Sequence, residues 1–546
     1  MSRHRNTPKN YWGRVLTVIF LFFFAVVLMS GTRPTQTDAQ NACIEGDANG
    51  DGKVTLADYS VWRKIFMAGA PSVSPTTPPS SAACPAGGIT VSPGQSIQQV
   101  IDTNPTQSVI CVKAGTYRED QIDPKEGDTI VGEGETTILN GSRLLTNFQS
   151  EGALWYVDGQ TQEGQVHGEC DKVIRCDHPE DTFINDQALL HVPDKSQVGP
   201  GKWFFDYPAN RIYIADNPAG KKIETSVVRH AIYGGGQNGV TVKNLVIEKY
   251  ANPTQFGAIQ NGDFAVTGGN NWTVDNVVAR LNHGTGIGFF SGSNNTVQNS
   301  KMVYNGQKGL GMGGTDAKVL HNEIAFNNFQ HAVSTGWEAG GSKFANTDGL
   351  LVQDNYVHHN FGPGLWTDID NINTTYDHNL VTDNEESGIF HEISYKATIK
   401  NNTVLRNGFQ GPGWCYGAGI LASASRDVEV FNNVVQANYH SIIGLQQQRG
   451  SGAYGAHEVQ NLNVHDNYIE SGTDHHAQTG VCADYATGID TTWNNHFTNN
   501  SYYGTTNTWA WNSQEITNFT QWQGFGNDVS GKQVPGAIPA NLFITR

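Results

Sequence analysis

One short pattern, Asn-x-[Val/Ile]-x-x-Asn with two looser variants, recurs through the middle of the chain and restricts its fold more than any other feature. Its last Asn lies at positions 282, 305, 327, 360, 384, 407 and 438, so the successive steps are 23, 22, 33, 24, 23 and 31 residues. A period in the twenties, broken by occasional insertions, is typical of a solenoid. Because a solenoid stacks equivalent residues in columns, the repeat predicts which residues are neighbours in space.

Each repeat alternates apolar and polar residues and contains no long helical stretch, which predicts short strands. The Asn positions fall at turns, where their side chains can stack as a ladder. Over about 89–504 the pattern resembles the right-handed parallel β-helix proteins of the pectate-lyase-like superfamily. The resemblance implies a mainly β solenoid. It implies no single chemistry, because lyases, hydrolases, epimerases and adhesins share this fold.

Segments outside the repeat predict two caps and an insertion. A strand from Ile89, a helix over Ser96–Ile101 and a strand over Ser108–Val112 are expected to close the N-terminal end of the solenoid. Residues 150–230 do not follow the repeat, and their short aromatic strands predict an inserted β module. The tail 505–546 carries three Trp and a helix-like piece near Ser513–Gln523, which predicts a C-terminal cap.

The N-terminus predicts export. Basic residues within 1–10 precede the apolar run Val15–Met29, and small residues follow near Ala39. This arrangement favours a secretory signal peptide over 1–39, and an uncleaved N-terminal anchor is the alternative. Either reading predicts a secreted or cell-surface protein in which disulfides can form. Residues 70–88 are rich in Pro, Ser, Thr and Ala and predict a linker.

The odd number of Cys, seven in all, leaves at least one without a partner inside the chain. Cys170 and Cys176 lie close together in a polar, turn-rich segment and form the first expected disulfide. Cys43 and Cys84 flank a small module and are expected to staple it. Cys111 lies in an apolar run and is expected to be a buried thiol. A Cys415–Cys482 bridge has no support from the sequence beyond being possible.

Residues 43–69 contain a twelve-residue loop of the calcium-binding type. Its predicted ligands are Asp47, Asn49, Asp51, the carbonyl of Lys53, and Asp58, with Gly52 making the sharp turn. The loop resembles one repeat of a dockerin, an EF-hand-like module. That resemblance implies Ca²⁺ as a bound ion, a cohesin-type scaffold as partner and an association with polysaccharide breakdown. Dockerins normally have two repeats and this chain shows one, so a purely structural calcium module is the alternative.

The charge balance limits the possible partners. The net charge is −17 with only 16% charged residues. This argues against nucleic acid and anionic membranes as partners. It also makes a polyanionic glycan an awkward substrate unless a metal or local basic groups intervene.

Aligning the repeats on their Gly-[Ile/Leu] strand starts brings carboxylates together. In Gly364–Asp368 and Gly388–Glu392 the Ile or Leu points inward, so Asp368 and Glu392 are expected to lie side by side on the outer face. The same alternation places Asp370 outward and Glu338 beside it. His391 should point inward. The alignment therefore predicts four neighbouring carboxylates, at 338, 368, 370 and 392.

Placing four like charges together lowers stability, so the patch is expected to have a function. A close carboxylate pair raises one pKa and so supplies a proton donor beside an ionised partner, as glycoside hydrolysis requires. Neighbours in one column suit a retaining pair, and the diagonal Asp370–Glu392 suits an inverting pair. The other use is a calcium site that binds an acidic sugar, as in many lyases of this fold.

The two longest steps between Asn turns insert segments on either side of this patch, where sites usually lie. Aromatic side chains there can stack on sugar rings, and Lys343, His391 and Lys396 are nearby. The expected substrate-binding residues are Trp337, Trp366, Lys343, Tyr395 and Trp414, with Tyr416 as a further aromatic.

The sequence therefore favours a secreted polysaccharide-acting β-helix protein that hydrolyses glycosidic bonds with members of the four-carboxylate group. Hydrolysis is favoured over elimination because carboxylates outnumber cations at the patch. A calcium-dependent lyase or epimerase is the alternative on the same scaffold. A non-catalytic glycan-binding surface protein is the third interpretation.

Overall fold

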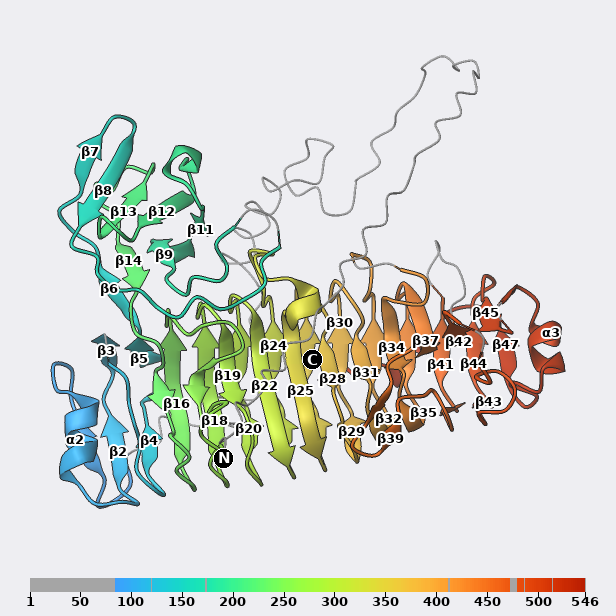
Figure 1. The fold of residues 1–546 in the computed structure, drawn as a ribbon. Helices are drawn as coiled ribbons and strands as arrows, with labels where there is room; N and C mark the ends of the chain where they lie inside the picture. The colour runs from blue at the N-terminus through green and yellow to red at the C-terminus, as the bar shows by residue number, and fades with distance from the viewer. Residues whose placement is uncertain are drawn as a thin grey trace, which may run out of the picture. The chain divides into compact units, whose positions relative to one another are not determined.

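The computed structural model describes residues 84–118, 120–171, 174–410, 413–471, 479–485, 487–512 and 514–545. The predicted signal segment, the calcium loop with its five ligands, and nearly all of the linker lie outside these residues. The described chain winds into a parallel β-helix (Figure 1). It is mainly β, with long parallel sheets, as the repeat predicts.

Two long sheets run the length of the solenoid. One has 12 strands, and its successive neighbours up to β45 pair in parallel. Its strands are β15 (Ile232–Tyr233), β17 (Gly257–Gln260), β19 (Thr285–Phe289), β22 (Lys308–Thr315), β25 (Gly340–Asp348), β28 (Leu365–Asp368), β31 (Ile389–Glu392), β34 (Ala418–Ser423), β37 (His440–Gln446), β42 (Thr479–Ala483), β45 (Trp509–Trp511) and β46 (Gln514–Ile516).

The second long sheet has 24 strands, two from most turns of the solenoid. They are β1 (Ile89–Val91), β2 (Val109–Val112), β3 (Gly115–Arg118), β4 (Thr129–Val131), β5 (Thr137–Asn140), β16 (Thr241–Glu248), β18 (Thr273–Arg280), β20 (Thr296–Gln298), β21 (Lys301–Val303), β23 (Lys318–Leu320), β24 (Glu323–Ala325), β26 (Leu351–Gln353), β27 (Tyr356–His358), β29 (Thr374–Asp377), β30 (Leu380–Thr382), β32 (Tyr395–Lys400), β33 (Thr403–Leu405), β35 (Arg426–Phe431), β36 (Val434–Gln436), β40 (Asn463–His465), β41 (Tyr468–Glu470), β43 (His496–Thr498), β44 (Ser501–Tyr503) and β47 (Lys532–Val534).

The repeated Asn residues form two buried ladders, one for each Asn of the pattern. In each ladder a side-chain Nδ2 donates to the Oδ1 of the equivalent Asn one turn later, at 2.9–3.0 Å. The same Asn side chains bond backbone amides and carbonyls at the turns. Buried polar groups must be hydrogen-bonded, and the ladder satisfies them at every turn. This requirement is the physical cause of the sequence repeat.

The core between the sheets is a column of apolar residues. On the 12-stranded sheet Ile287, Leu310, Leu365, Ile389 and Ile420 lie in one inward column and are fully buried, with the buried Ser342 between Leu310 and Leu365. The stacking fixes the register, because a slip of one residue would turn these side chains outward. The outward positions of the same strands are therefore fixed as well.

The N-terminal cap contains helix α2 (Ile97–Thr103), which runs two residues further than the sequence predicts. The Ser96 side chain caps it by accepting from the Gln99 amide. Ile97 and Ile101 bury their side chains in the core. A disulfide joins Cys84 to Cys111 at this end. The expectation of a Cys43–Cys84 bridge and a free Cys111 is therefore wrong: the buried Cys111 is the partner of Cys84.

The inserted module lies between β5 and β15 and has its own core. Four strands form one small sheet, β6 (Ser142–Leu144), β9 (Thr182–Ile184), β10 (Gln187–Ala188) and β14 (Ile223–Ser226). Five form another, β7 (Gln149–Glu151), β8 (Leu154–Asp158), β11 (Leu190–His191), β12 (Lys202–Asp206) and β13 (Arg211–Ile214). Trp203, Phe205, Ile212 and Ile214 are buried between them.

The C-terminal segment continues the solenoid before closing it. Strand β45 pairs with β42 and β47 pairs with β44, so both long sheets extend beyond residue 504. Helix α3 (Phe519–Gly524) then packs Trp522 against Trp509, with both indoles fully buried. Short elements complete the fold: β38 (Ser451–Gly452), β39 (Gly455–Ala456), η1 (Gly134–Thr136), η2 (Lys195–Gln197), η3 (Thr335–Trp337) and η4 (Ala540–Leu542). None of the helices in the described part of the chain is long and apolar enough to cross a membrane.

Candidate active site

The outer face of the 12-stranded sheet brings two carboxylates together. Strands β28 and β31 pair so that Asp368 lies beside Glu392, as the repeat predicts. Neighbouring strands are about 4.8 Å apart. Both residues are buried, with 7% and 6% of their surface exposed. Thr367 and His391 point inward from the same strands and hydrogen-bond to each other at 2.7 Å.

The other two predicted carboxylates do not join the pair as expected. Strand β28 ends at Asp368, because Ile369 and Asp370 both adopt left-handed backbone angles. Alternation therefore stops there. Asp370 instead accepts hydrogen bonds from the Ala453 amide and contacts His457 Nε2 at 3.2 Å. The prediction that Asp370 lies beside Glu338 is wrong, because Glu338 contacts Lys308 and Lys343 instead. The Asp370 amide donates to the carbonyl of Ile393, the residue after Glu392, at 2.9 Å.

Glu338 is connected to the Asp368–Glu392 pair through Lys343, which contacts both Glu338 and Asp368. It follows η3 as a left-handed cap with φ 75°. Its carboxylate contacts Lys308 Nζ at 2.5 Å and Lys343 Nζ at 3.2 Å. Burial opposes its ionisation, but the two ammonium groups outweigh burial and hold the Glu338 pKa at about 2. Glu338 is therefore a fixed anion and not a proton donor.

Lys343 links Glu338 to Asp368. It projects from β25, and its Nζ lies 2.8 Å from Asp368 Oδ2 and 4.4 Å from the centre of the Trp366 ring. Burial lowers the Lys343 pKa, but the charges of Glu338 and Asp368 more than compensate and raise it. The other oxygen, Asp368 Oδ1, is buried and has no hydrogen-bond partner among the described residues. A buried carboxylate oxygen without a partner is costly and rare.

The pKa of Glu392 is shifted in the opposite direction to that of Glu338. Burial first, and then the charge of Asp368, raise its pKa above the usual range, and Arg449 only partly opposes this. Arg449 forms an ion pair with one carboxylate oxygen, and the Trp366 indole N–H donates to the other at 3.2 Å. One site therefore holds an acid with a raised pKa beside a carboxylate paired with a lysine.

Sequence reasoning missed two cations here, Lys308 and Arg449. Lys308 begins β22 and faces outward, one position before the Gly-Leu strand start. Arg449 lies in the 34-residue step between the ladder residues Asn433 and Asn467. That long step was a signal for an inserted segment. Counting both residues gives three cations against Glu338, Asp368 and Glu392, so carboxylates do not outnumber cations at this site.

The predicted aromatic residues occupy different environments. Trp366 is buried and stacks on Phe390, with ring centres 5.4 Å apart, so it orients Glu392 and offers no free face. Tyr395 is buried, and its hydroxyl donates to the Gly455 carbonyl in the β38–β39 hairpin. Trp337 is half-buried, and Trp414 is 58% exposed.

Of the remaining nearby residues, His391 is buried in the core, and burial lowers its pKa to about 4. Its position confirms the inward direction that alternation predicts. Lys396 is exposed, and the structure gives it no contact with the carboxylate pair. Tyr416 is half-buried and donates to Gln447 Oε1 at 2.7 Å.

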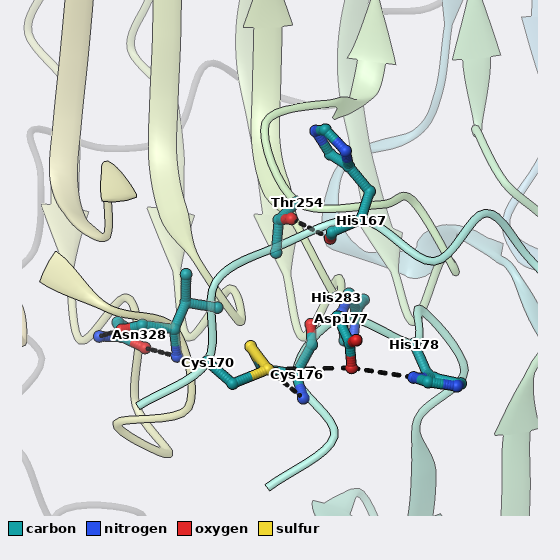
Figure 2. Close-up of a disulfide and its surroundings, with 9 residues drawn as sticks. His167, Cys170, Cys176, Asp177, His178, Thr254, His283 and Asn328 are labelled. Carbon is teal, nitrogen blue, oxygen red and sulfur yellow. Dashed lines mark hydrogen bonds and ion pairs between the residues drawn. A yellow bond between two sulfur atoms is a disulfide. The ribbon is translucent and has the colours of Figure 1, made fainter. Parts of the chain in front are cut away.

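A loop of the inserted module packs against the segment that carries Trp337 and Glu338. Cys170 and Cys176 form the expected disulfide, and Cys170 makes an antiparallel bridge with Val333. Figure 2 shows this disulfide beside Asp177, with Thr254 donating to the His167 carbonyl above it. The His167 ring meets the Trp337 ring edge-on at 5.2 Å. The module therefore helps to position the turn that holds Glu338.

A third disulfide, Cys415–Cys482, closes the opposite side of the site. Its sulfurs pack with Leu421 and Ile443, which continue the outward column that starts at Trp366 and Phe390. The sequence allowed this bridge without supporting it. Among the described residues, no group of three or more His, Cys, Asp or Glu side chains is arranged to hold a metal ion.

Comparisons with known proteins agree with the fold. Residues 262–435 match the family model described as right handed beta helix region. The solved complex of XylC with xylose is similar with a TM-score of 0.58 and 14% identity, covering 75% of this chain and 80% of that one. No curated protein matches the sequence.

Weaker similarities have TM-scores of 0.46. The A-module of the Azotobacter vinelandii mannuronan C-5 epimerase AlgE4 is 11% identical, covering 74% of this chain and 88% of that one. A mannuronic acid specific polysaccharide family 6 lyase from human gut microbiota is 10% identical, covering 83% and 92%. These two weaker likenesses carry no argument about this chain. The long parallel sheets and the family match show a parallel β-helix protein with a buried carboxylate pair on the outer face of one sheet.

Proposed function

We propose that the protein is a glycoside hydrolase in which Asp368 is the nucleophile and Glu392 is the acid/base. The observation that carries the proposal is a buried oxygen, Asp368 Oδ1, that has no hydrogen-bond partner within the described residues and lies beside an acid whose pKa is raised. Two carboxylates with different protonation states are the minimum that glycoside hydrolysis needs.

The geometry supports a retaining reaction. Retaining pairs lie about 5–5.5 Å apart, close to the roughly 4.8 Å between neighbouring strands. Asp368 attacks the anomeric carbon as the glycosidic bond breaks, and Glu392 gives its proton to the leaving oxygen. Glu392 then takes a proton from water, and that water attacks the anomeric carbon and releases Asp368. Lys343 stabilises the carboxylate form of Asp368, to which the reaction returns.

The similarity to a structure that holds xylose supports a sugar ligand and makes xylosides the first substrates to test. The three cations of the site are each paired with a carboxylate, so none is left to neutralise an acidic sugar. This pairing favours a neutral sugar over a uronate. The cation count itself no longer separates hydrolysis from elimination, so the product must decide between them.

The test is a screen of the full-length protein on xylan, aryl xylosides and a panel of neutral and acidic polysaccharides. New reducing ends without an ultraviolet-absorbing product are expected. An unsaturated product that absorbs in the ultraviolet and disappears on chelation would replace the hydrolase with a calcium-dependent lyase. Binding without any product would favour a glycan-binding surface protein.

The N-terminal loop supports a second, separate proposal of Ca²⁺ binding through Asp47, Asn49, Asp51, Lys53 and Asp58. It rests on the sequence, as does the proposal of a cohesin-type partner. Calorimetric titration of the full chain with Ca²⁺ should show a site that the variant Asp51→Ala with Asp58→Ala lacks. Equal heats from both proteins would refute it.

A further inference from the structure

An exposed aromatic pair lies on the outer face of the 12-stranded sheet, away from the carboxylates. Phe264 is 70% exposed, and its ring meets the half-buried Phe290 ring edge-on at 4.4 Å. Both rings pack on the buried Phe256, at 5.6 and 5.7 Å. Exposed apolar surface on a fixed cluster is a candidate binding surface where a second observation points to a ligand.

The loop that carries Phe264 is held in place by several hydrogen bonds. Asp263 Oδ1 accepts from the Ala265 and Val266 amides, and its Oδ2 accepts from the Tyr233 hydroxyl at 2.8 Å. Asn261 accepts from the Phe290 amide. The ring is therefore presented by a fixed loop against a fixed strand end.

The strand register places the aromatic pair in line with the carboxylates. Phe289 pairs with Met312, Met312 with Phe344, and Phe344 with Thr367. Phe290 follows Phe289 as Asp368 follows Thr367, so both occupy equivalent outward positions. Three strand steps separate them, a span of about 14 Å, or several sugar rings.

The two strands between them carry only small residues in that column. The equivalent position is Gly313 in β22, where the register with β25 shifts, and Ala345 in β25. The preceding outward positions in β19 and β22 are Gly288 and Gly311. The same row continues in β25 with Lys343, whose ammonium contacts Glu338 and Asp368, and the Lys308 side chain lies over Gly311. The column of Gly313 and Ala345 itself carries no bulky side chain.

We propose that Phe264 and Phe290 form a distal subsite for the same glycan chain that reaches Asp368 and Glu392, so that the protein acts on extended oligosaccharides or polysaccharides. The proposal rests on the proposed function for its choice of ligand. The C–H faces of a sugar ring are apolar and pack on aromatic rings. The chain would lie along the solenoid axis, from Phe290 over Gly313 and Ala345 to the carboxylates.

The test measures retardation in native gels that contain soluble xylan, mannuronan or glucan. Asp368→Asn serves as the background, so that no polysaccharide is digested. The protein should be slowed by at least one polysaccharide, and Phe264→Ala should reduce the apparent affinity several-fold. Phe264→Trp keeps an aromatic face and should restore it. Val529→Ala is the matched control, because Val529 is 71% exposed in the C-terminal segment.

The subsite proposal would be overturned if Phe264→Ala were slowed as much as the Asp368→Asn background protein. It would also be overturned if no polysaccharide slowed the background protein. A second readout uses the active enzyme and compares a short with a long substrate of the sugar that the screen identifies. Phe264→Ala should raise KM for a hexasaccharide and leave kcat/KM for an aryl monoglycoside unchanged. Absence of turnover in the screen would refute the hydrolase, while the gel result would still decide the subsite.

Discussion

Two buried groups of charges in this molecule are built from the same residue types and have opposite properties. At the junction of the inserted module, Glu224 is fully buried and both of its oxygens are paired, with Lys249 at 2.5 Å and Arg118 at 2.7 Å. At the candidate site, Asp368 leaves one buried oxygen without a partner in the described chain.

The pKa shifts separate the two groups in the same way. Burial raises the Glu224 pKa, but Lys249 and Arg118 outweigh it and lower the pKa overall. Burial and a neighbouring anion raise the Glu392 pKa. Removing one member of a completely paired buried group leaves an uncompensated charge and costs stability, whereas a group that already lacks a partner can bind a ligand there. Completeness of pairing, more than burial, therefore separates Glu224 from Asp368, and it is the basis for proposing that Asp368 acts in catalysis.

The largest expected effect comes from removing the charge of the incomplete pair. Asp368→Asn should lower kcat on the order of 10⁴-fold, because it removes the proposed nucleophile. Glu392→Gln should have a similar effect on substrates with poor leaving groups. Thermal unfolding of both variants should stay close to that of the unmodified protein. Retention of more than a tenth of the activity by either variant would contradict the assigned roles.

Glu224→Gln tests the complete group and should act on stability. It leaves the buried Lys249 with an incomplete partner set, so the free energy of unfolding should fall by about 3–5 kcal/mol. At temperatures where the variant stays folded, kcat should be close to normal. Denaturant unfolding and steady-state kinetics on one preparation measure both. A stable but inactive variant would show that the two groups are not distinct.

The stability of the two groups should also depend on pH in opposite directions. The Glu224 pKa is lowered on folding, so its contribution is present above its unfolded pKa near 4.5 and is lost as the pH falls. The Glu392 pKa is raised on folding, so stability falls as the pH rises through its folded pKa. Unfolding of Glu392→Gln at neutral pH should therefore cost no less free energy than that of the unmodified protein. A clear destabilisation there would contradict the raised pKa.

Arg449→Gln should change the pH profile of activity more than its maximum. Arg449 is the cation that lowers the Glu392 pKa, so its removal should shift the alkaline limb of kcat/KM to higher pH. Arg406→Gln is the matched control, because Arg406 pairs with Asp383 on the other long sheet. An alkaline limb that stays in place would exclude Glu392 as the titrating acid.

The smallest expected effect concerns the Cys170–Cys176 disulfide. Replacing both Cys by Ser should loosen the turn with Trp337 and Glu338 and raise KM a few-fold, with a smaller change in kcat. Replacing Cys84 and Cys111 by Ser affects the N-terminal cap and should leave both kinetic parameters unchanged. Identical kinetics in the two double variants would remove any role of the module's loop at the site.

The sequence was sufficient for the parts of the molecule that repeat. The Asn ladders and the alternation along β28 and β31 predict that Asp368 and Glu392 are neighbours, and the register confirms it. The repeat does not predict the conformation of residues that lie outside its regular strands. Asp370 follows a left-handed residue and Glu338 follows a 3-10 turn, so neither position obeys alternation.

Contacts between residues that are far apart in the sequence could not be predicted from the repeat either. Arg449 arrives from an insertion whose path no repeat dictates, and its contact with Glu392 spans 57 positions. The pairing of Cys84 with Cys111 depends on how the cap folds back on the first turn. The sequence therefore predicted the pair itself and missed the cations and loops that surround it.

The decisive measurement is the anomeric configuration of the first product, followed by NMR during hydrolysis of the substrate that the screen identifies. Neighbouring carboxylates in one column predict that the product first appears with the configuration of the substrate. Inversion, or an unsaturated product, would contradict the account that Asp368 and Glu392 act together as nucleophile and acid.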